Sequence, residues 1–101
     1  MPRRQHTSFQ ALQLFTLLLN ARDAWFYGYQ LCEATELKSG TLYPLLMRLA
    51  DQGLLDAKWE VSAIAGRPPR HLYRLTDAGV QLAQSRVAEF AARLATRLAT
   101  A

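Results

Sequence analysis

The chain has 101 residues, which is enough for one domain with a modest hydrophobic core. Half of the residues are hydrophobic and a fifth are charged, a composition that excludes a disordered chain. Lys and Arg outnumber Asp and Glu by 12 to 8, and the net charge of +4 favours an anionic partner. The single cysteine, Cys32, excludes an intramolecular disulfide and a cysteine-based zinc site.

The apolar segments argue against a membrane protein. The longest apolar run, residues 14–19, contains Thr16 and is far too short to span a bilayer. Residues 1–4 are basic, but the apolar region and cleavage site of a signal peptide do not follow them. We therefore expect no membrane association and predict a cytoplasmic protein.

The first third of the chain has helical periodicity. A helix is predicted over about residues 7–22, in which Thr7 and Gln10 form a capping box and apolar residues recur at helical spacing. Residues 23–28 break this pattern, and a second, shorter helix is predicted over about residues 28–34. A turn then leads into the next helical segment.

A third helix is predicted from Ser39, a good N-cap residue, to about Gln52, with Gly53 as its C-terminal stop. Pro44 removes one backbone hydrogen bond close to the start, so we expect a distorted first turn and not a broken helix. A stripe of leucines predicts the face that packs in the core, and Thr41, Tyr43, Met47 and Arg48 fall outside it. The stripe consists of Leu42, Leu45, Leu46 and Leu49.

Alternating residues predict a β-hairpin after the third helix. Apolar and polar residues alternate over residues 55–60, which indicates a strand with one solvated face. Residues 71–75 form a second extended run, and the loop between the two runs predicts a protruding tip. Pro68 and Pro69 stiffen this tip and hold Arg67 and Arg70 out to solvent.

A last, long helix follows the hairpin. Thr76 and Asp77 are predicted to cap it, and it extends to about Thr100, or roughly 35 Å. A small domain covers only part of such a helix, so the apolar seam along it predicts a dimer interface. The predicted dimerisation seam consists of Val80, Ala83, Val87, Phe90, Leu94 and Leu98.

This order of elements predicts a mainly α fold with a small β-hairpin. The second and third helices form a helix-turn-helix, a unit whose second helix fits the major groove of B-DNA. We divide the chain into a basic N-terminal arm at residues 1–6, a winged helix-turn-helix DNA-binding domain at residues 7–76 and a C-terminal dimerisation helix at residues 77–101. Arg3 and Arg4 of the arm could add a DNA contact.

Several motifs carry a family resemblance. They are Gly28-Tyr-Gln-Leu, Ser39-Gly-Thr-Leu-Tyr-Pro-Leu-Leu-Met-Arg-Leu, Gly53-Leu-Leu, Gly66-Arg-Pro and Tyr73-Arg-Leu-Thr-Asp-Ala-Gly79. With them the sequence resembles the PadR family of bacterial transcriptional regulators over about residues 12–82. The resemblance implies a winged helix-turn-helix, a homodimer joined through the C-terminal helix, and repression of a nearby promoter. Some members respond to phenolic or other hydrophobic molecules.

The sequence departs from the family pattern at two places. The linker before Ser39 is shorter than in many relatives, which affects the entry to the recognition helix. A single C-terminal helix is expected, as in the short branch of the family, in place of the larger helical domain of the long members.

The resemblance also implies a set of DNA-binding residues. Ser39, Thr41 and Tyr43 match the DNA-facing start of the recognition helix, Lys38 and Arg48 are placed to meet phosphate, and Arg67 and Arg70 occupy the wing. Most of them are expected to contact the DNA backbone, although Arg67 could read a narrow minor groove. Two alternatives stay open: Tyr43 packs on the wing, or Arg67 and Arg70 are simply solvated.

The remaining candidate residues have mainly structural interpretations. The aromatic residues Trp25, Phe26, Trp59 and Phe90 are predicted to fill the core or an interface, with an effector pocket between subunits as the alternative. Cys32 is expected to be an ordinary buried residue without a redox role. His6 and His71 are isolated and predict no metal site. No catalytic set and no phosphate-binding loop is recognisable, so we predict neither an enzyme nor a cofactor.

The predicted function is therefore sequence-specific DNA binding by a transcriptional regulator, a repressor that acts as a homodimer on a palindromic operator. Release by a small hydrophobic or aromatic effector is a further hypothesis. Two alternatives remain: a winged-helix module that binds proteins and not DNA, and a DNA-binding autoregulatory factor without a ligand.

Overall fold

The computed structural model describes residues 8–100 of the chain. The predicted N-terminal arm and Thr7 lie outside these residues. As the sequence predicts, the fold is mainly helical with a small antiparallel sheet. No helix within the described residues has the length and apolar character needed to cross a membrane. The elements in chain order are α1 (Phe9–Asn20), β1 (Phe26–Tyr27), α2 (Gly28–Thr35), α3 (Ser39–Asp51), β2 (Leu55–Glu60), β3 (Arg70–Leu75) and α4 (Asp77–Thr100).

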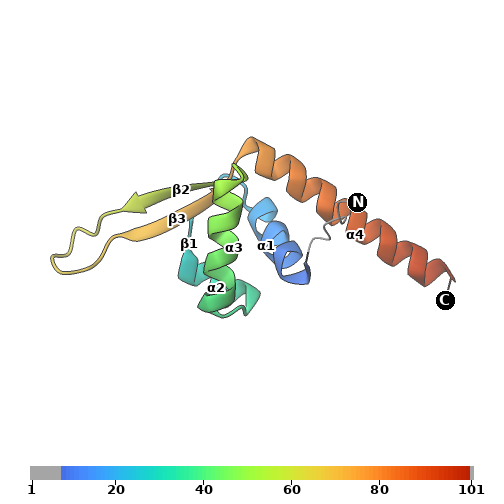
Figure 1. Cartoon of the computed structure of the whole chain (residues 1–101), viewed down its shortest axis with the longest axis horizontal. Helices are drawn as coiled ribbons and strands as arrows, with labels where there is room; N and C mark the ends of the chain where they lie inside the picture. Colours follow the sequence, from blue (N-terminus) through green and yellow to red (C-terminus); the bar gives the residue numbers. More distant parts are fainter. Residues whose placement is uncertain (1–7, 101) are drawn as a thin grey trace, which may run out of the picture.

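Two extensions leave the central helices in opposite directions (Figure 1). Helices α1, α2 and α3 form the centre, the β2–β3 hairpin projects from one side, and α4 projects from the other. The molecule is consequently elongated, with principal extents of 59 × 28 × 25 Å. We refer to the projecting hairpin with its connecting loop, residues 55–75, as the wing.

The sheet contains a strand that the sequence does not predict. Its order is β1-β3-β2, and both pairings are antiparallel. In β1, Phe26 lies opposite Tyr73 and Tyr27 lies opposite Leu72. The strand β3 begins at Arg70, which pairs with Glu60, so Arg70 belongs to the sheet and not to the tip of the wing.

The hydrophobic core lies between the helices and the inner end of the hairpin. Its largest fully buried side chains are Leu14, Leu18, Leu31, Leu42 and Leu46. The leucine stripe of α3 faces this core, with Leu45 partly buried at its margin. The alternation predicted for β2 is wrong beyond its first residue, because only Leu55 of that strand is buried.

The N-caps of α1 and α3 each lie one residue from the predicted position. The N-cap of α1 is Ser8, whose hydroxyl accepts a hydrogen bond from the backbone N–H of Ala11 at 3.1 Å. The N-cap position of α3 is Lys38, and Ser39 is the first helical residue. No side chain caps α3. The start of α3 therefore keeps backbone N–H groups that no side chain occupies.

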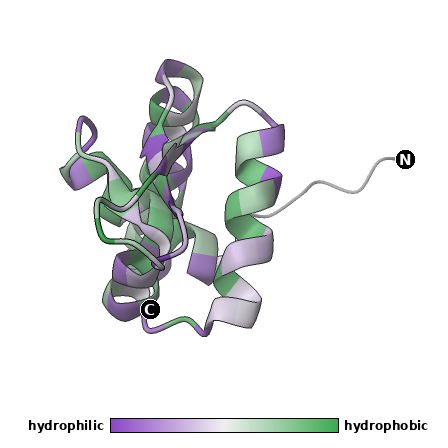
Figure 2. Ribbon diagram, turned by 90° about the vertical axis from the view of Figure 1, so that its left-hand side faces the viewer, coloured by the Kyte–Doolittle hydropathy of each residue, from purple (hydrophilic) through white to green (hydrophobic). Residues whose placement is uncertain are grey.

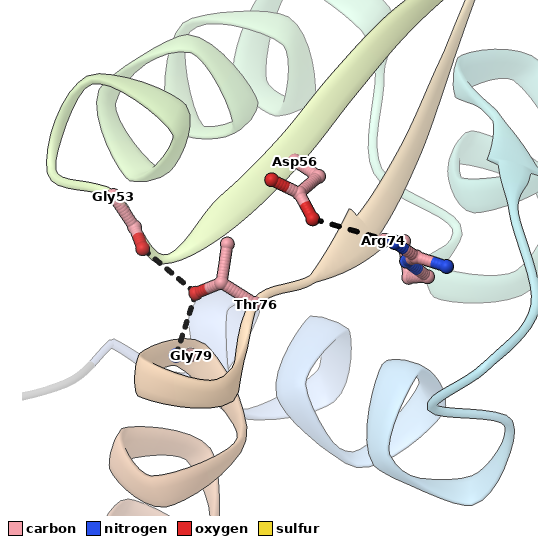
Figure 3. A network of polar contacts seen from close by, with 5 residues as sticks. All are labelled: Gly53, Asp56, Arg74, Thr76 and Gly79. Atoms are coloured by element: carbon pink, nitrogen blue, oxygen red, sulfur yellow. Dashed lines mark hydrogen bonds and ion pairs between the residues drawn. The ribbon is translucent and has the colours of Figure 1, made fainter.

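A polar junction links the end of α3 to the start of α4 (Figure 3). The Thr76 hydroxyl donates a hydrogen bond to the Gly53 carbonyl at 2.7 Å and accepts one from the Gly79 N–H at 2.9 Å. Gly53 has a φ of +75° and ends α3, as predicted. At Gly79 a Cβ atom would collide with the Leu54 carbonyl oxygen, so this close approach requires glycine.

Helix α4 uses part of its apolar seam inside its own protomer. Val80 and Ala83 are 6% and 0% exposed and belong to the core, where α4 packs on α1. Assigning these two residues to a dimer interface is therefore wrong, because their side chains are already covered. Val87 is partly buried against the same core. The exposed remainder of the seam consists of Phe90, Leu94 and Leu98, at 37%, 47% and 71% exposure.

Candidate nucleic-acid interface

A tight turn joins α2 to α3 and sets the direction of α3. The Thr35 side chain is buried, and its hydroxyl donates a hydrogen bond to the Leu31 carbonyl at 2.6 Å. The same hydroxyl accepts a hydrogen bond from the Leu37 N–H at 3.4 Å. Glu36 ends α2 with a left-handed φ of +59°. The two helices therefore form the helix-turn-helix that the sequence predicts.

The first turn of α3 offers backbone as well as side chains to a partner. Lys38, Ser39, Thr41 and Tyr43 are all exposed. Gly40 lies among them, and no atom lies within 4 Å of the position that a Cβ would occupy there. The uncapped N-terminus carries the positive end of the helix dipole, which favours phosphate. Gly40, which the sequence analysis does not single out, thus allows close approach to the helix backbone.

In the loop at the tip of the wing, residues 61–69, every residue except the partly buried Ser62 is exposed. Gly66 has a φ of +86°, and the Arg67 N–H donates a hydrogen bond to the Ile64 carbonyl at 3.3 Å. Ile64 and Val61 are exposed by 56% and 78%. Viewed from the side of the wing, the hairpin carries both hydrophobic and hydrophilic residues (Figure 2). The tip therefore presents an arginine beside apolar side chains.

Four of the predicted DNA-binding residues are basic, exposed and without an ion pair in the part of the chain that the structure describes. Ion pairs within residues 8–100 join Asp56 with Arg74 and Arg86 with Glu89, both at 3.5 Å. The positive charges of the four unpaired residues are therefore free to meet an anion. These four residues are Lys38, Arg48, Arg67 and Arg70.

A groove of about 520 Å³ lies between α3 and the outer ends of β2 and β3. Tyr43 stands at its α3 side and is 37% exposed. The Tyr43 ring packs so closely on Gly28 that a Cβ at Gly28 would lie 2.6 Å from the ring. Tyr43 therefore packs on the start of α2 and presents an accessible edge to the groove. Other side chains that line the groove are Tyr27, Tyr29, Trp59, Arg70 and His71.

Aromatic rings and cations brace the base of the wing. The Trp25 ring lies between Lys58 Nζ at 4.3 Å and Arg74 Cζ at 4.4 Å, distances measured to the ring centroid. The Tyr27 hydroxyl donates a hydrogen bond of 2.5 Å to Glu60, and this bond to a carboxylate raises the pKa of Tyr27. The Arg70 guanidinium lies 5.5 Å from the Tyr27 centroid. Strand β1 is thereby tied to both strands of the hairpin.

The four aromatic residues proposed for an effector pocket do not meet within the protomer. Trp59 lines the groove beside α3, whereas Phe90 lines a separate groove of about 400 Å³ between α1 and α4. Trp25 is held by the two cations, and Phe26 packs against the core. Trp59 is 63% exposed, so it does not fill the core as expected. Cys32 is partly buried against the core.

A helix-turn-helix followed by a projecting hairpin defines the winged helix-turn-helix class of DNA-binding domains. Residues 18–85 match the Transcriptional regulator PadR-like family. The match spans more than half of the chain and includes α2, α3, the wing and the start of α4. The protein therefore belongs to the PadR-like family, as its motifs indicate.

Solved structures of PadR-like proteins have the same fold. A PadR-like transcription factor from Bacteroides fragilis is 26% identical with a TM-score of 0.73, and the alignment covers 91% of this chain and 92% of that chain. A PadR family regulator from Eggerthella lenta is 31% identical with a TM-score of 0.66, over 86% of this chain and 75% of that chain. None of the curated protein sequences matches the chain significantly.

Proposed function

We propose that this protein is a sequence-specific DNA-binding repressor that acts as a homodimer on a palindromic operator in the cytoplasm. The observation that carries the proposal is the groove between α3 and the wing. Tyr43 of α3 borders it on one side and Arg70 of the wing borders it on the other, and Arg70 forms no ion pair among the described residues. This arrangement suits one strand of a duplex beside an inserted helix.

The residues on this surface have different roles in the proposal. Thr41 and Tyr43, at the start of α3, meet base edges in the major groove and contribute to sequence preference. Ser39 and the uncapped helix start meet phosphate. Lys38, Arg48, Arg67 and Arg70 neutralise further phosphates, and Arg67 at the tip reaches toward the minor groove.

A second copy of the chain completes the proposed regulator. Phe90, Leu94 and Leu98 form an exposed apolar seam on α4, and Phe90 also borders the groove against α1. Pairing along this seam would place two recognition helices in successive major grooves, about 34 Å apart. A hydrophobic effector bound between the subunits would release DNA if it favoured a spacing that the operator cannot accept.

The salt dependence of DNA binding tests the proposal. Labelled genomic duplexes are titrated with the protein at low and high salt. For 6–10 phosphate contacts, affinity is expected to fall by about 10³–10⁵ between about 50 and 200 mM salt. Salt-independent binding, or no binding to any genomic fragment, would instead favour a protein-interaction module.

Charge variants show whether the surface is the one described. Arg67→Ala and Arg70→Ala should each weaken binding to all duplexes alike and reduce the salt slope by about one per phosphate contact removed. Arg97→Ala removes the same charge from α4, far from the wing, and should leave the slope unchanged. Thr41→Ala should change the preferred sequence and leave the slope intact. If none of these variants alters binding, DNA does not lie on this surface.

Thermal shift tests the effector. Aromatic and cationic hydrophobic compounds are screened against the protein. A ligand at 100 times its dissociation constant should stabilise the folded state by about 2.7 kcal/mol. A broad library without any stabilising compound would favour the ligand-free autoregulatory factor.

A further inference from the structure

Trp59 has an unusual position for the largest apolar side chain of the wing. Its indole is 63% exposed at the rim of the groove between α3 and the wing. Tryptophan is enriched at binding interfaces, where its large ring provides contact area beside polar groups. We propose, on the basis of the DNA-binding function proposed above, that Trp59 is a DNA-contacting residue whose ring packs on the sugar–phosphate backbone lying in this groove.

The Trp59 ring is held ready for such a contact. His71, the residue opposite Trp59 in the β2–β3 pairing, lies with its ring centroid 3.6 Å from that of Trp59. The His71 ring in turn meets Tyr73 edge-on at 5.8 Å, and Tyr73 is buried. This row of rings runs from the core to the rim. It fixes the indole before DNA binds, so little side-chain freedom remains to be lost on binding.

The rest of the groove has the complementary chemistry of a nucleotide backbone. Arg70 provides a cation that forms no ion pair within residues 8–100, and the Glu60 carboxylate opposite it in the sheet accepts the Tyr27 hydroxyl bond. Tyr29, 49% exposed, adds a phenol that can donate a hydrogen bond to phosphate. A deoxyribose phosphate presents an apolar sugar face next to an anion, and the groove presents a ring next to a guanidinium.

Continuity with the start of α3 favours duplex DNA over a free aromatic ligand. Tyr43 belongs both to the exposed first turns of α3 and to the lining of the groove. Lys38, Arg48 and Arg67 provide further positive charges outside the groove, and none of them forms an ion pair within residues 8–100. A small molecule would use only Arg70, whereas a strand of DNA would use the charges on both sides.

The two tryptophans of the chain allow a direct test with an internal control. Trp25→Phe leaves Trp59 as the only tryptophan, and Trp59→Phe leaves Trp25, whose ring is held between Lys58 and Arg74 and does not line the groove. Acrylamide quenching of tryptophan emission is measured for each variant, without DNA and with a saturating mixed-sequence duplex at low salt. Fluorescence polarisation of the labelled duplex reports binding in the same samples.

We expect the duplex to shield Trp59 from acrylamide and to leave the quenching of Trp25 unchanged. If the duplex binds by polarisation while Trp59 remains fully accessible, the inference is overturned and the proposed function stands. If no duplex binds, both are overturned. Shielding of Trp59 by a small aromatic compound but not by the duplex would assign the groove to a ligand and also overturn the inference.

An affinity measurement separates a ring contact from a charge contact. Trp59→Ala removes an uncharged contact, so it should weaken duplex binding about tenfold at every salt concentration without changing the salt slope. Trp59→Phe keeps a ring and should restore most of the affinity. Unchanged affinity of a folded Trp59→Ala variant, checked by circular dichroism, would contradict the inference.

Discussion

The exposed half of the α4 seam makes dimer formation quantitatively testable through Phe90→Glu. The exposed fractions of Phe90, Leu94 and Leu98 are 37%, 47% and 71%. Complete burial of one Leu or Phe contributes about 1.5–3 kcal/mol, so covering these exposed fractions contributes about 2–5 kcal/mol per protomer. Phe90 supplies about a quarter of this gain. The substitution therefore removes about 1–2 kcal/mol per symmetric dimer before any charge is considered.

The new carboxylates add a larger effect. Two Glu side chains would enter an apolar interface, and the desolvation of each carboxylate costs several kcal/mol. The dissociation constant of the dimer should therefore rise at least about 100-fold. Multi-angle light scattering over a protein dilution series measures this change, and circular dichroism verifies the helix content.

Ala92→Glu is the matched control, because it places the same charge on the same helix away from the seam. Ala92 is exposed and lies about 160° around the helix from Phe90. This variant should remain dimeric. If Phe90→Glu stays dimeric at the same concentrations, the α4 seam is not the interface. Loss of operator affinity should accompany dissociation of the dimer, because each half-site alone is bound weakly.

Three further predictions follow from local contacts. Gly79→Ala forces a methyl group against the Leu54 carbonyl, so it should lower the free energy of unfolding by about 1–3 kcal/mol. Urea denaturation measures this change. An unchanged stability would show that α4 can move away from Leu54. Gly40→Ala meets open space and should stabilise α3 by about 0.5–1 kcal/mol while weakening DNA binding; unchanged affinity would mean that DNA does not approach this backbone. The hydrogen bond to Glu60 raises the pKa of Tyr27, so its contribution to stability is present below the ordinary tyrosine pKa of about 10 and is lost as pH rises through the raised value. Glu60→Gln should move one phenol to lower pH in an ultraviolet titration, and an unshifted titration would exclude the bond.

The elements that sequence patterns predict well are those whose causes are local. The leucine stripe of α3 repeats at helical spacing, and Leu42 and Leu46 are indeed fully buried. The stop at Gly53 and the cap at Thr76 depend on residues adjacent to the helix ends. In contrast, β1 has only two residues and exists because it pairs with the distant β3. A pair of residues has no measurable period, so no local pattern could reveal this strand.

The exposure of Trp59 shows that the alternation of residues in a strand does not determine how deeply each side chain is buried. Leu55 and Trp59 have the same parity in β2, which predicts that both face the core. Leu55 lies at the inner end of the hairpin and is 3% exposed. Trp59 lies near the outer end of the strand, where its indole borders a groove instead of the core and is 63% exposed. Residue parity determines which face of a strand a side chain lies on. How far the hairpin extends beyond the rest of the domain determines whether anything covers that face.

Helix α4 presents the same difficulty along its axis. Its apolar period continues without interruption from Val80 to Leu98, so the sequence contains no mark where the protomer's core ends. The structure supplies that boundary, because α1 covers Val80 and Ala83 but leaves Leu94 and Leu98 exposed. The boundary depends on the length of α1 and on the crossing of the two helices, and neither can be deduced from the pattern in α4.

The junction at Thr76 explains how a change along α4 would reach the DNA-binding surface. The Thr76 hydroxyl binds both the Gly53 carbonyl at the end of α3 and the Gly79 N–H at the start of α4. The close approach of Gly79 to Leu54 leaves no space for α4 to tilt toward α3. Helix α3 and the beginning of α4 must therefore move together. Consequently, a ligand that alters how two α4 helices cross would change the distance between two recognition helices, and it need not touch either one.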